Sequence, residues 1–286
     1  MNEDATTDLE CGGQAAFEII TAARETPLVF ASPHSGSVYP PDLRPAALPV
    51  TALRSAEDAL VDRLVASGPQ HGATLLAGRI ARTYLDLNRR ADEWDPLLIE
   101  DCPPGPVSTR AQAGYGVVPR LTGDGHRLYD RRLPQAEALD RVARVHRPYH
   151  RALAELMQGA QARHGVAVLI DWHSMPSRAT GGDGGADIVL GDRHGTSCPA
   201  RLTRRLRALF EGLGWRVALN RPYAGGYATQ TWGRPPEGFW AIQVELNRAL
   251  YLDEATLEPG LGWSRCSKGL ERVITALTND IDGLVR

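Results

Sequence analysis

Three apolar segments that each stop abruptly at a polar motif constrain the fold of this chain more than any other feature. They are PLVFASPH (27–34), VAVLIDWHSMPS (166–177) and FWAIQVELNRALY (239–251). Short runs of consecutive apolar residues bounded by turn-forming residues are typical of strands that are buried on both faces of a sheet. Side chains that follow such strands gather at the edge of the sheet where α/β proteins bind their ligands.

Helical patterns lie between these strands, and they indicate the fold class. We expect helices over 55–68, over 133–165 with an interruption at Pro148, over 198–215, and in the last 30 residues. Further strands are expected at 16–22 and within 181–192, and 73–88 suggests a strand pair or one bent strand. The alternation predicts a single α/β domain over 16–286, with a mixed, largely parallel sheet flanked by helices, after a flexible tail at 1–15.

Composition excludes several classes of protein. The 286 residues are 43% hydrophobic and 23% charged with a formal net charge of −2, so no electrostatic feature predicts binding to nucleic acid or to an anionic membrane. The four cysteines form no C-x-x-C pair. The N-terminus lacks the features of a signal peptide, and no apolar run reaches the roughly 20 residues of a membrane span. We therefore expect a cytoplasmic protein, whose oligomeric state the sequence leaves open.

Two histidines at strand ends are candidate metal ligands. His34 lies between Pro33 and Ser35, where a hydrogen-bonded turn residue is the alternative. His173 follows Asp171 by two residues, so both side chains lie on one side of the strand. A histidine ligand usually donates its second N–H to a carboxylate or carbonyl, which this pair would allow. A polar end to the strand is the other interpretation.

Further polar groups follow the other strand ends. Glu245 comes after a deeply apolar run, so its carboxylate must be paired, bound to metal or raised in pKa; an ion pair with Arg248 or Arg89 is the plain alternative. Asn88 and Arg89 follow Asp86 and suit a substrate carboxylate, because a guanidinium binds carboxylates bidentately; an ordinary surface turn is the alternative.

Together these groups favour zinc-dependent hydrolysis, in which three protein ligands leave a position for water and a carboxylate takes its proton. The chain has no G-x-S-x-G or GxxxxGK[ST] motif. A Ser174 nucleophile is conceivable, but its position next to His173 does not make a catalytic triad. The Gly- and aromatic-rich segment 222–238 is either a substrate lid or a plain connection.

The motifs ASPHSG, SAEDALVD, YLDLNR, IDWHSMPS, GGY followed by GRP, and IQVELNRALYLDE resemble, in order, those of the N-formylglutamate amidohydrolases. The resemblance runs from about residue 25 to the C-terminus. That family is related to zinc-carboxypeptidase-like hydrolases such as aspartoacylase. The resemblance implies a mixed sheet flanked by helices and hydrolysis of a small-molecule N-acyl amino acid.

The resemblance also implies roles for single residues. The wider group carries H-x-x-E, but Ser37 stands at the glutamate position here, so Asp58, with Glu57 as the alternate, would replace it. One Zn²⁺ would then be bound by His34, Asp58 and His173. Glu245 is similar to the general base of this group.

The substrate contacts follow from the same resemblance. They comprise Arg82 at the acyl oxygen, Asn88 and Arg89 at the carboxylate, and Ser174, Tyr227 and Thr231, the last where relatives often carry His. The predicted reaction converts an N-formyl or other small N-acyl amino acid, such as N-formyl-L-glutamate, to the free amino acid and formate. Hydrolysis of another N-acyl amino acid, amide or peptide, and a non-catalytic metal-binding homologue, are the alternatives.

Overall fold

A mixed, mostly parallel sheet forms the centre of the molecule. The computed structural model describes residues 10–11, 14–182 and 184–286. Within them, one sheet contains, in spatial order, β3 (Phe17–Ile20), β5 (Thr74–Gly78), β4 (Leu28–Ser32), β6 (Ala167–Met175), β9 (Phe239–Asn247), β7 (Ile188–Gly191) and β8 (Val217–Leu219). The four strands from β5 to β9 are mutually parallel, β8 is parallel to β7, and β3 and β7 run antiparallel to their neighbours β5 and β9. The predicted α/β class is confirmed.

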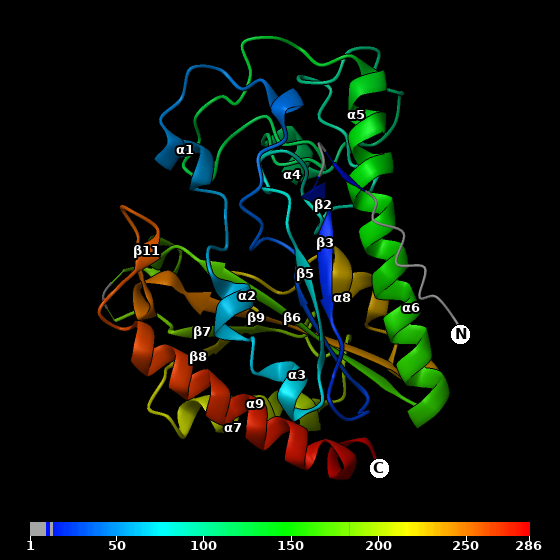
Figure 1. The fold of residues 1–286 in the computed structure, drawn as a ribbon, viewed down its shortest axis with the longest axis vertical. Coiled ribbons are helices and arrows are strands. Elements are labelled where there is room, and N and C mark those ends of the chain that lie inside the picture. The colour runs from blue at the N-terminus through cyan, green and yellow to red at the C-terminus, as the bar shows by residue number, and fades with distance from the viewer. Residues whose placement is uncertain (1–9, 12–13, 183) are drawn as a thin grey trace.

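Helices cover both faces of this sheet. In β6, Val168 and Ile170 face a core shared with α2 (Val61–Leu64), α7 (Ala200–Glu211) and α9 (Trp263–Val285). The alternate residue Leu169 faces a second core, shared with α5 (Gln135–Arg141), α6 (Arg147–His164) and α8 (Tyr227–Trp232). In Figure 1 the long helices α6 and α9 lie on the right and at the lower left, with the sheet between them. Burial on both faces explains why the central strands are apolar throughout.

The helix expected over 133–165 is interrupted as predicted. A π-helical turn at Val142–His146 separates α5 from α6, and Pro148 lies in the first turn of α6. Proline has no N–H to donate and its ring crowds the carbonyl four residues earlier, so a widened turn before it relieves both problems. The wider turn also directs His146 toward the loop that follows β5, where its Nε2 lies 2.8 Å from the carbonyl oxygen of Arg89.

The continuous helix predicted over 55–68 is wrong. Instead α1 (Val50–Arg54) is followed by a turn at 55–60, then by α2 and by α3 (Gly68–His71). Leu60 has a left-handed φ of 63°, which a helix interior does not allow. The Arg248 guanidinium donates to the carbonyl oxygens of Ser55 and Glu57, at 3.1 and 2.6 Å. These two oxygens therefore accept from a side chain rather than from backbone N–H groups of a helix. The sequence pattern contained no sign of this distant partner.

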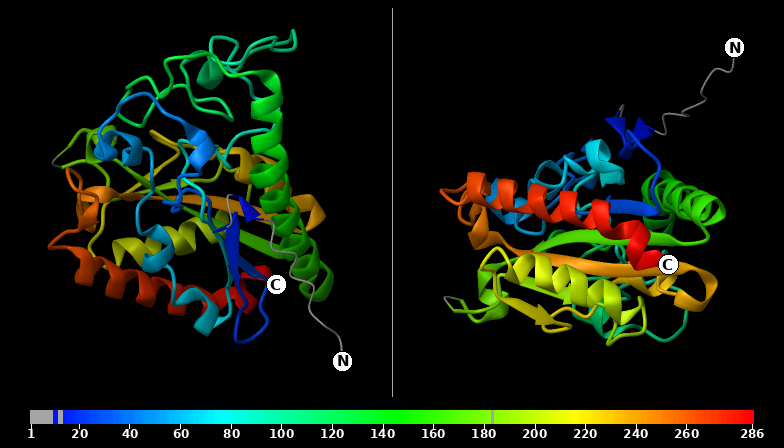
Figure 2. Two further views of the ribbon diagram at one scale, coloured as in Figure 1. Left: turned by 45° about the horizontal axis from the view of Figure 1, so that its top comes forward. Right: turned by 90° about the horizontal axis from the view of Figure 1, so that it is seen from below.

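The predicted strand character of 82–88 is also wrong. β5 ends at Gly78, and the following residues form successive turns in which the Asp86 amide donates to the Val117 carbonyl at 2.8 Å. The segment 90–116 is a long loop with one short helix, α4 (Thr109–Gln112). Residues 80–133 gather at the top of the molecule in Figure 1, and Figure 2 shows them from two further directions.

The chain termini add two small ladders and one long helix. β1 (Glu10–Cys11) pairs with β2 (Gln14–Ala15), and β10 (Leu252–Asp253) pairs with β11 (Glu258–Pro259). Residues 1–9 and 12–13 of the predicted flexible tail lie outside the described residues.

Helix α7 ends at Glu211, three residues before Gly214, whose positive φ of 80° marks the turn that follows.

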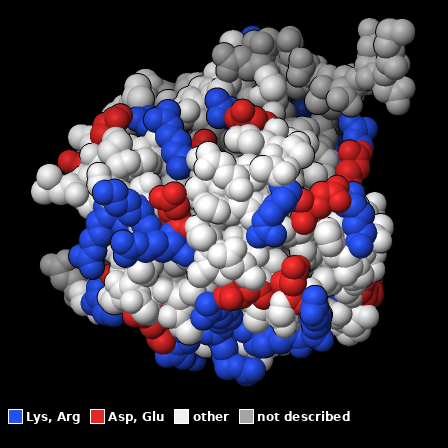
Figure 3. Space-filling view, turned by 60° about the horizontal axis from the view of Figure 1, so that its bottom comes forward, with Lys and Arg blue, Asp and Glu red and all other residues white. Residues whose placement is uncertain are grey.

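The surface carries both signs of charge. On the face shown in Figure 3, basic and acidic side chains are interspersed, in keeping with 32 Lys and Arg against 34 Asp and Glu. One ion pair joins α7 to α9, where Arg205 Nε donates to Asp280 Oδ2 at 2.7 Å. Among the described residues, none of the helices combines the length and apolar character that crossing a membrane requires.

Candidate active site

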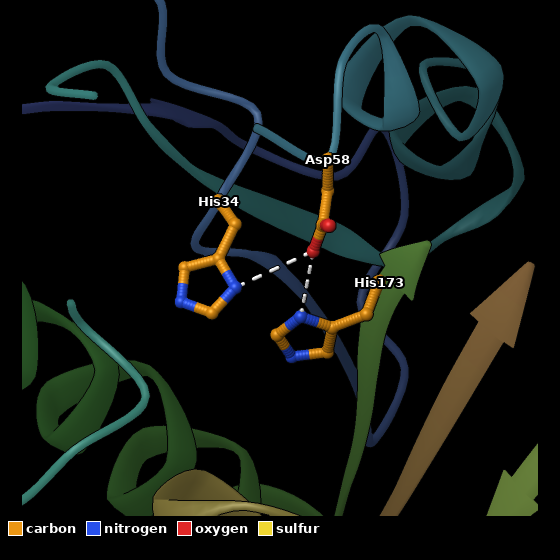
Figure 4. A group of neighbouring side chains, drawn as sticks. All are labelled: His34, Asp58 and His173. Atoms are coloured by element: carbon orange, nitrogen blue, oxygen red, sulfur yellow. Dashed lines mark hydrogen bonds and ion pairs between the residues drawn. The ribbon is translucent and has the colours of Figure 1, made fainter. Parts of the chain in front are cut away.

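Two histidines and one aspartate converge at the carboxyl edge of the sheet. His34 follows β4, His173 lies near the end of β6, and Asp58 comes from the turn before α2. Asp58 Oδ2 lies 3.3 Å from His34 Nδ1 and 2.9 Å from His173 Nδ1, and the three ligand-type atoms all lie within 4.8 Å of one another (Figure 4). All three side chains are buried, and this group could hold a metal ion.

Each histidine is oriented by a carboxylate of its own. His34 Nε2 lies 2.8 Å from Asp86 Oδ1, and His173 Nε2 lies 3.1 Å from Asp171 Oδ2. These partners occupy the far side of each ring, so both Nδ1 atoms face Asp58. The buried His34 Nδ1 has no hydrogen-bond partner within the described part of the chain. Such an atom is costly unless something binds it, and histidine ligands are usually supported by a carboxylate in this way.

The local field favours a cation. Burial alone would raise the pKa of Asp86, but Arg82, Arg89 and His34 hold it well below its usual range. Burial would lower the pKa of His173, but Asp171 and Asp58 raise it well above its usual value. The carboxylates therefore stabilise positive charge between the two rings, whether that charge is a proton or a metal ion.

Arg248 decides which neighbouring carboxylate enters the group. Its Nη2 lies 3.2 Å from Asp58 Oδ1, so Oδ2 is left to face the histidines. Glu57, the alternate ligand in the sequence prediction, is buried, but its carboxylate accepts hydrogen bonds from Arg54, at 3.2 Å, and from Tyr39. The structure thus brings Asp58 to the histidines and leaves Glu57 outside the group.

Glu245 lies beside this group on the adjacent strand. β9 pairs with β6 so that Glu245 is in register with His173. Its Oε1 accepts a hydrogen bond from Gln243 Nε2 at 2.6 Å, and no ion pair with Arg248 or Arg89 occurs among the described residues. Burial raises the pKa of Glu245 to about 7, with Asp58 acting in the same direction and His173 against it. A carboxylate with such a pKa is suited to taking up and releasing a proton near neutral pH.

The loop after β5 lines the other side. Arg82 Nε donates to Asp86 Oδ2 at 2.9 Å. Arg89 donates to the carbonyls of Tyr115 and Asn88, both at 2.9 Å. The predicted set Asp86, Asn88 and Arg89 is thus brought to the site by turns rather than by a strand end.

These groups surround a cavity of about 650 Å³. Of the predicted site residues, eight line it: His34, Asp58, Arg82, Asn88, Arg89, His173, Ser174 and Glu245. Tyr227 and Thr231 are not among the lining residues. Tyr227 instead packs on His146 and His150, with ring centroids 6.0 and 5.1 Å away.

Sequence reasoning missed several lining residues. Tyr223, rather than Tyr227, lines the cavity, as do Arg110, Arg178 and Gln243. The unusual length of the 90–116 loop was a signal for Arg110, because long loops within a domain often carry function. Gln243 sits two residues before Glu245 on β9, and the strand period of two was the available signal for it.

The fold and this cavity define a class: an α/β protein with a candidate metal centre beside a buried carboxylate, at the carboxyl edge of a mostly parallel sheet. The chain belongs to the N-formylglutamate amidohydrolase family, whose model matches residues 26–252. It is therefore an amidohydrolase, an enzyme that acts on an amide bond.

Individual relatives agree. The chain is 31% identical over 243 residues to the N-formylglutamate deformylase of Pseudomonas aeruginosa, covering 83% of this chain and 86% of that protein. The Pseudomonas putida enzyme of the same name is 28% identical over 233 residues, covering 80% and 82% of the two chains. The crystal structure of N-formylglutamate amidohydrolase from Ralstonia eutropha JMP134 superposes with a TM-score of 0.87 at 35% identity, covering 93% of this chain and 98% of that one.

Proposed function

We propose that this chain is a metal-dependent deformylase that hydrolyses N-formyl-L-glutamate to L-glutamate and formate. The observation that carries the proposal is the buried group of His34, Asp58 and His173, with Glu245 on the adjacent strand of the same cavity. Curated relatives named N-formylglutamate deformylase support the choice of substrate.

The residues present fit a metal ion. Two imidazole nitrogens and one carboxylate oxygen are a common ligand set for catalytic zinc, and His34 Nδ1, which forms no hydrogen bond among the described residues, would become a ligand. We therefore assign one Zn²⁺ to His34, Asp58 and His173; iron or manganese would suit the same set. A bound divalent ion supplies Lewis-acid chemistry, lowering the pKa of a water molecule and polarising the acyl carbonyl.

Glu245 is the proposed general base. It takes a proton from the water whose oxygen attacks the formyl carbon, and it delivers a proton to the amine nitrogen as the C–N bond breaks. The pKa near 7 lets one carboxylate do both. Arg82 reaches the cavity while its Nε is held by Asp86, which suits it to stabilise negative charge on the acyl oxygen.

Arginines in the cavity suit a substrate with two carboxylates. Arg89 is the proposed partner of the α-carboxylate. Further along the lining, the Arg110 guanidinium has no hydrogen bond or ion pair in the described part of the chain, where the Arg178 guanidinium donates to the Gly123 carbonyl alone, at 3.1 Å. Among the described residues no carboxylate pairs with either guanidinium, which favours an acidic side chain on the substrate. Ser174 also lines the cavity, whereas Tyr227 and Thr231 would act from outside its lining.

Steady-state kinetics on a matched panel tests this proposal. N-formyl-L-glutamate should exceed its neutral isostere N-formyl-L-glutamine in kcat/KM by roughly 10-fold or more, the value of one charge-assisted hydrogen bond. The kcat/KM values for N-acetyl- and N-succinyl-L-glutamate show whether the enzyme prefers a formyl group over larger acyl groups. Removal of metal by a chelator should abolish turnover, and added Zn²⁺ should restore it. An enzyme that hydrolyses none of the N-formyl amino acids, or that works equally well without metal, contradicts the proposal.

A further inference from the structure

Two amide side chains of the cavity lining, Gln243 and Asn88, are linked by hydrogen bonds to the proposed general base, Gln243 directly and Asn88 through Gln243. Gln243 and Glu245 lie two residues apart on β9 and so project from the same face of the strand. Gln243 Nε2 donates to Glu245 Oε1 at 2.6 Å, and the two residues are only 4% and 6% exposed. No hydrogen bond to the second oxygen, Oε2, occurs within the described residues. One carboxylate oxygen is thus held by the protein, and the other is left for water.

The orientation of the Gln243 amide follows from this bond. An ionised carboxylate only accepts hydrogen bonds, so the Gln243 nitrogen must face Glu245 and its oxygen must face away. On that far side, Asn88 Nδ2 lies 3.5 Å from Gln243 Oε1. Asn88 Oδ1 in turn accepts from the backbone N–H of Ala228, in the first turn of α8, at 3.1 Å. The donors therefore run in one direction, from α8 through Asn88 and Gln243 to Glu245.

The link to α8 is tightly packed. Asn88 is 5% exposed and lies against Gly226, where an added Cβ would approach its side-chain nitrogen to 2.2 Å. Only glycine allows so close an approach at this position. The same Asn88 nitrogen is 3.2 Å from His173 Nε2, so the link also touches a proposed ligand.

We propose that Gln243 is a positioning residue for Glu245, and that Asn88 connects it to α8. The inference rests on the proposed role of Glu245 as general base. Gln243 suits this role because an uncharged amide donates to the carboxylate without neutralising it, as an arginine or lysine would. Its bond to Oε1 sets the plane of the carboxylate and directs Oε2 toward the attacking water. Gln243 acts through Glu245, so it should affect the rate of the chemical step more than substrate binding.

Substitution of Gln243 tests this inference. Gln243→Met keeps the length of the side chain but removes the donor, and should lower kcat roughly 10- to 100-fold, the value of one hydrogen bond to a charged group. KM and metal content should stay within about twofold of the wild-type values, a split that general damage to the fold would not produce. Gln243→Glu, which places an acceptor opposite Oε1, should lower kcat further. Gln230→Met, at an exposed position of α8, is the matched control and should change nothing.

A double-mutant cycle separates positioning from an independent effect. In a Glu245→Asp background the shortened carboxylate cannot reach Gln243, so Gln243→Met should add less than about threefold to the loss. Equal losses in both backgrounds, or wild-type kcat for Gln243→Met, would overturn the inference. Glu245→Gln is assayed in parallel: if that variant is fully active, the proposed function itself has failed, whereas an inactive Glu245→Gln with a fully active Gln243→Met rejects only the positioning role.

Discussion

The molecule contains two pairs of histidines in which the two rings lie close together, and the pairs differ in the groups that their ring nitrogens contact. The ring centroids of His34 and His173 are 4.8 Å apart, and those of His146 and His150 are 4.2 Å apart. In the first pair each Nε2 faces a carboxylate, whereas in the second the Nε2 atoms face backbone carbonyls, of Arg89 and of Leu87, both at 2.8 Å.

The partners, rather than the histidines, decide what each pair can do. Asp171 and Asp58 raise the pKa of His173, so the first pair attracts positive charge. Burial lowers the pKa of His146, and burial together with His146 lowers the pKa of His150 to about 3, so the second pair stays neutral. The first pair suits a cation, and the second holds the loop after β5 against α6. The predictions below test this division of roles.

The largest effect is expected from loss of a ligand. His34→Ala should remove the bound metal and reduce kcat/KM by about 10³-fold or more, because the Lewis acid is lost. Metal analysis by mass spectrometry together with steady-state kinetics measures both. His150→Gln, which can still donate to the Leu87 carbonyl, is the control from the second pair and should retain stoichiometric metal. Loss of metal from both variants would show that the two pairs are not functionally distinct.

Loss of the general base comes next. Glu245→Gln should lower kcat roughly 10²- to 10⁴-fold, since the amide cannot accept the proton of water. Metal content should be unchanged, because Glu245 lies beside the proposed ligands rather than among them. Glu237→Gln, at an exposed site before β9, serves as the matched control. Substantial activity in Glu245→Gln would assign the base to another residue.

An intermediate effect is expected from substitution of Asp171, the carboxylate that contacts the proposed ligand His173. Asp171→Asn should weaken metal binding roughly 10- to 100-fold while leaving the three ligands in place. Competition with a chromogenic chelator measures the dissociation constant. Asp192→Asn offers a buried aspartate on the far side of β9, bonded to Thr203 Oγ1 at 2.9 Å, and should lower stability without changing metal affinity. Equal metal affinity in Asp171→Asn and the wild type would remove the proposed difference between the histidine pairs.

The smallest effect is expected in the pH dependence of stability. The folded-state pKa of His150 is about 3 and its unfolded value is near 6.5, so between these values the unfolded chain binds the extra proton. Stability should therefore fall as the pH drops from 6.5, by at most about 1.4 kcal/mol per pH unit from this group. His150→Gln does not titrate and should flatten the slope of the unfolding free energy between pH 7 and pH 5. An unchanged slope would mean that His150 is not held neutral.

Local patterns were sufficient to predict the central strands β4, β6 and β9 and the two histidines that follow or end them. Strands β4, β6 and β9 are apolar on both faces, so their positions, and the polar residues that follow them, can be recognised from the sequence. The interruption of the helix before Pro148 follows equally from the chemistry of one residue. In contrast, the segments 55–60 and 82–88 were predicted as regular structure, although they form turns. Contacts with distant parts of the chain stabilise these turns, and a local pattern does not show such contacts.

By itself the sequence determined the fold class, the three central strands and the chemical groups that the sheet edge would present. Only the tertiary structure decided which of two similar residues, close together in the sequence, reaches the site. Asp58 and Glu57 are adjacent acids with similar local patterns, and Arg248, 190 residues further along the chain, holds Asp58 beside the histidines. Likewise, Tyr223 lines the cavity and Tyr227 does not, and the local sequence did not distinguish them. Periodicity records how a residue sits on its own element, whereas a site forms where distant elements meet.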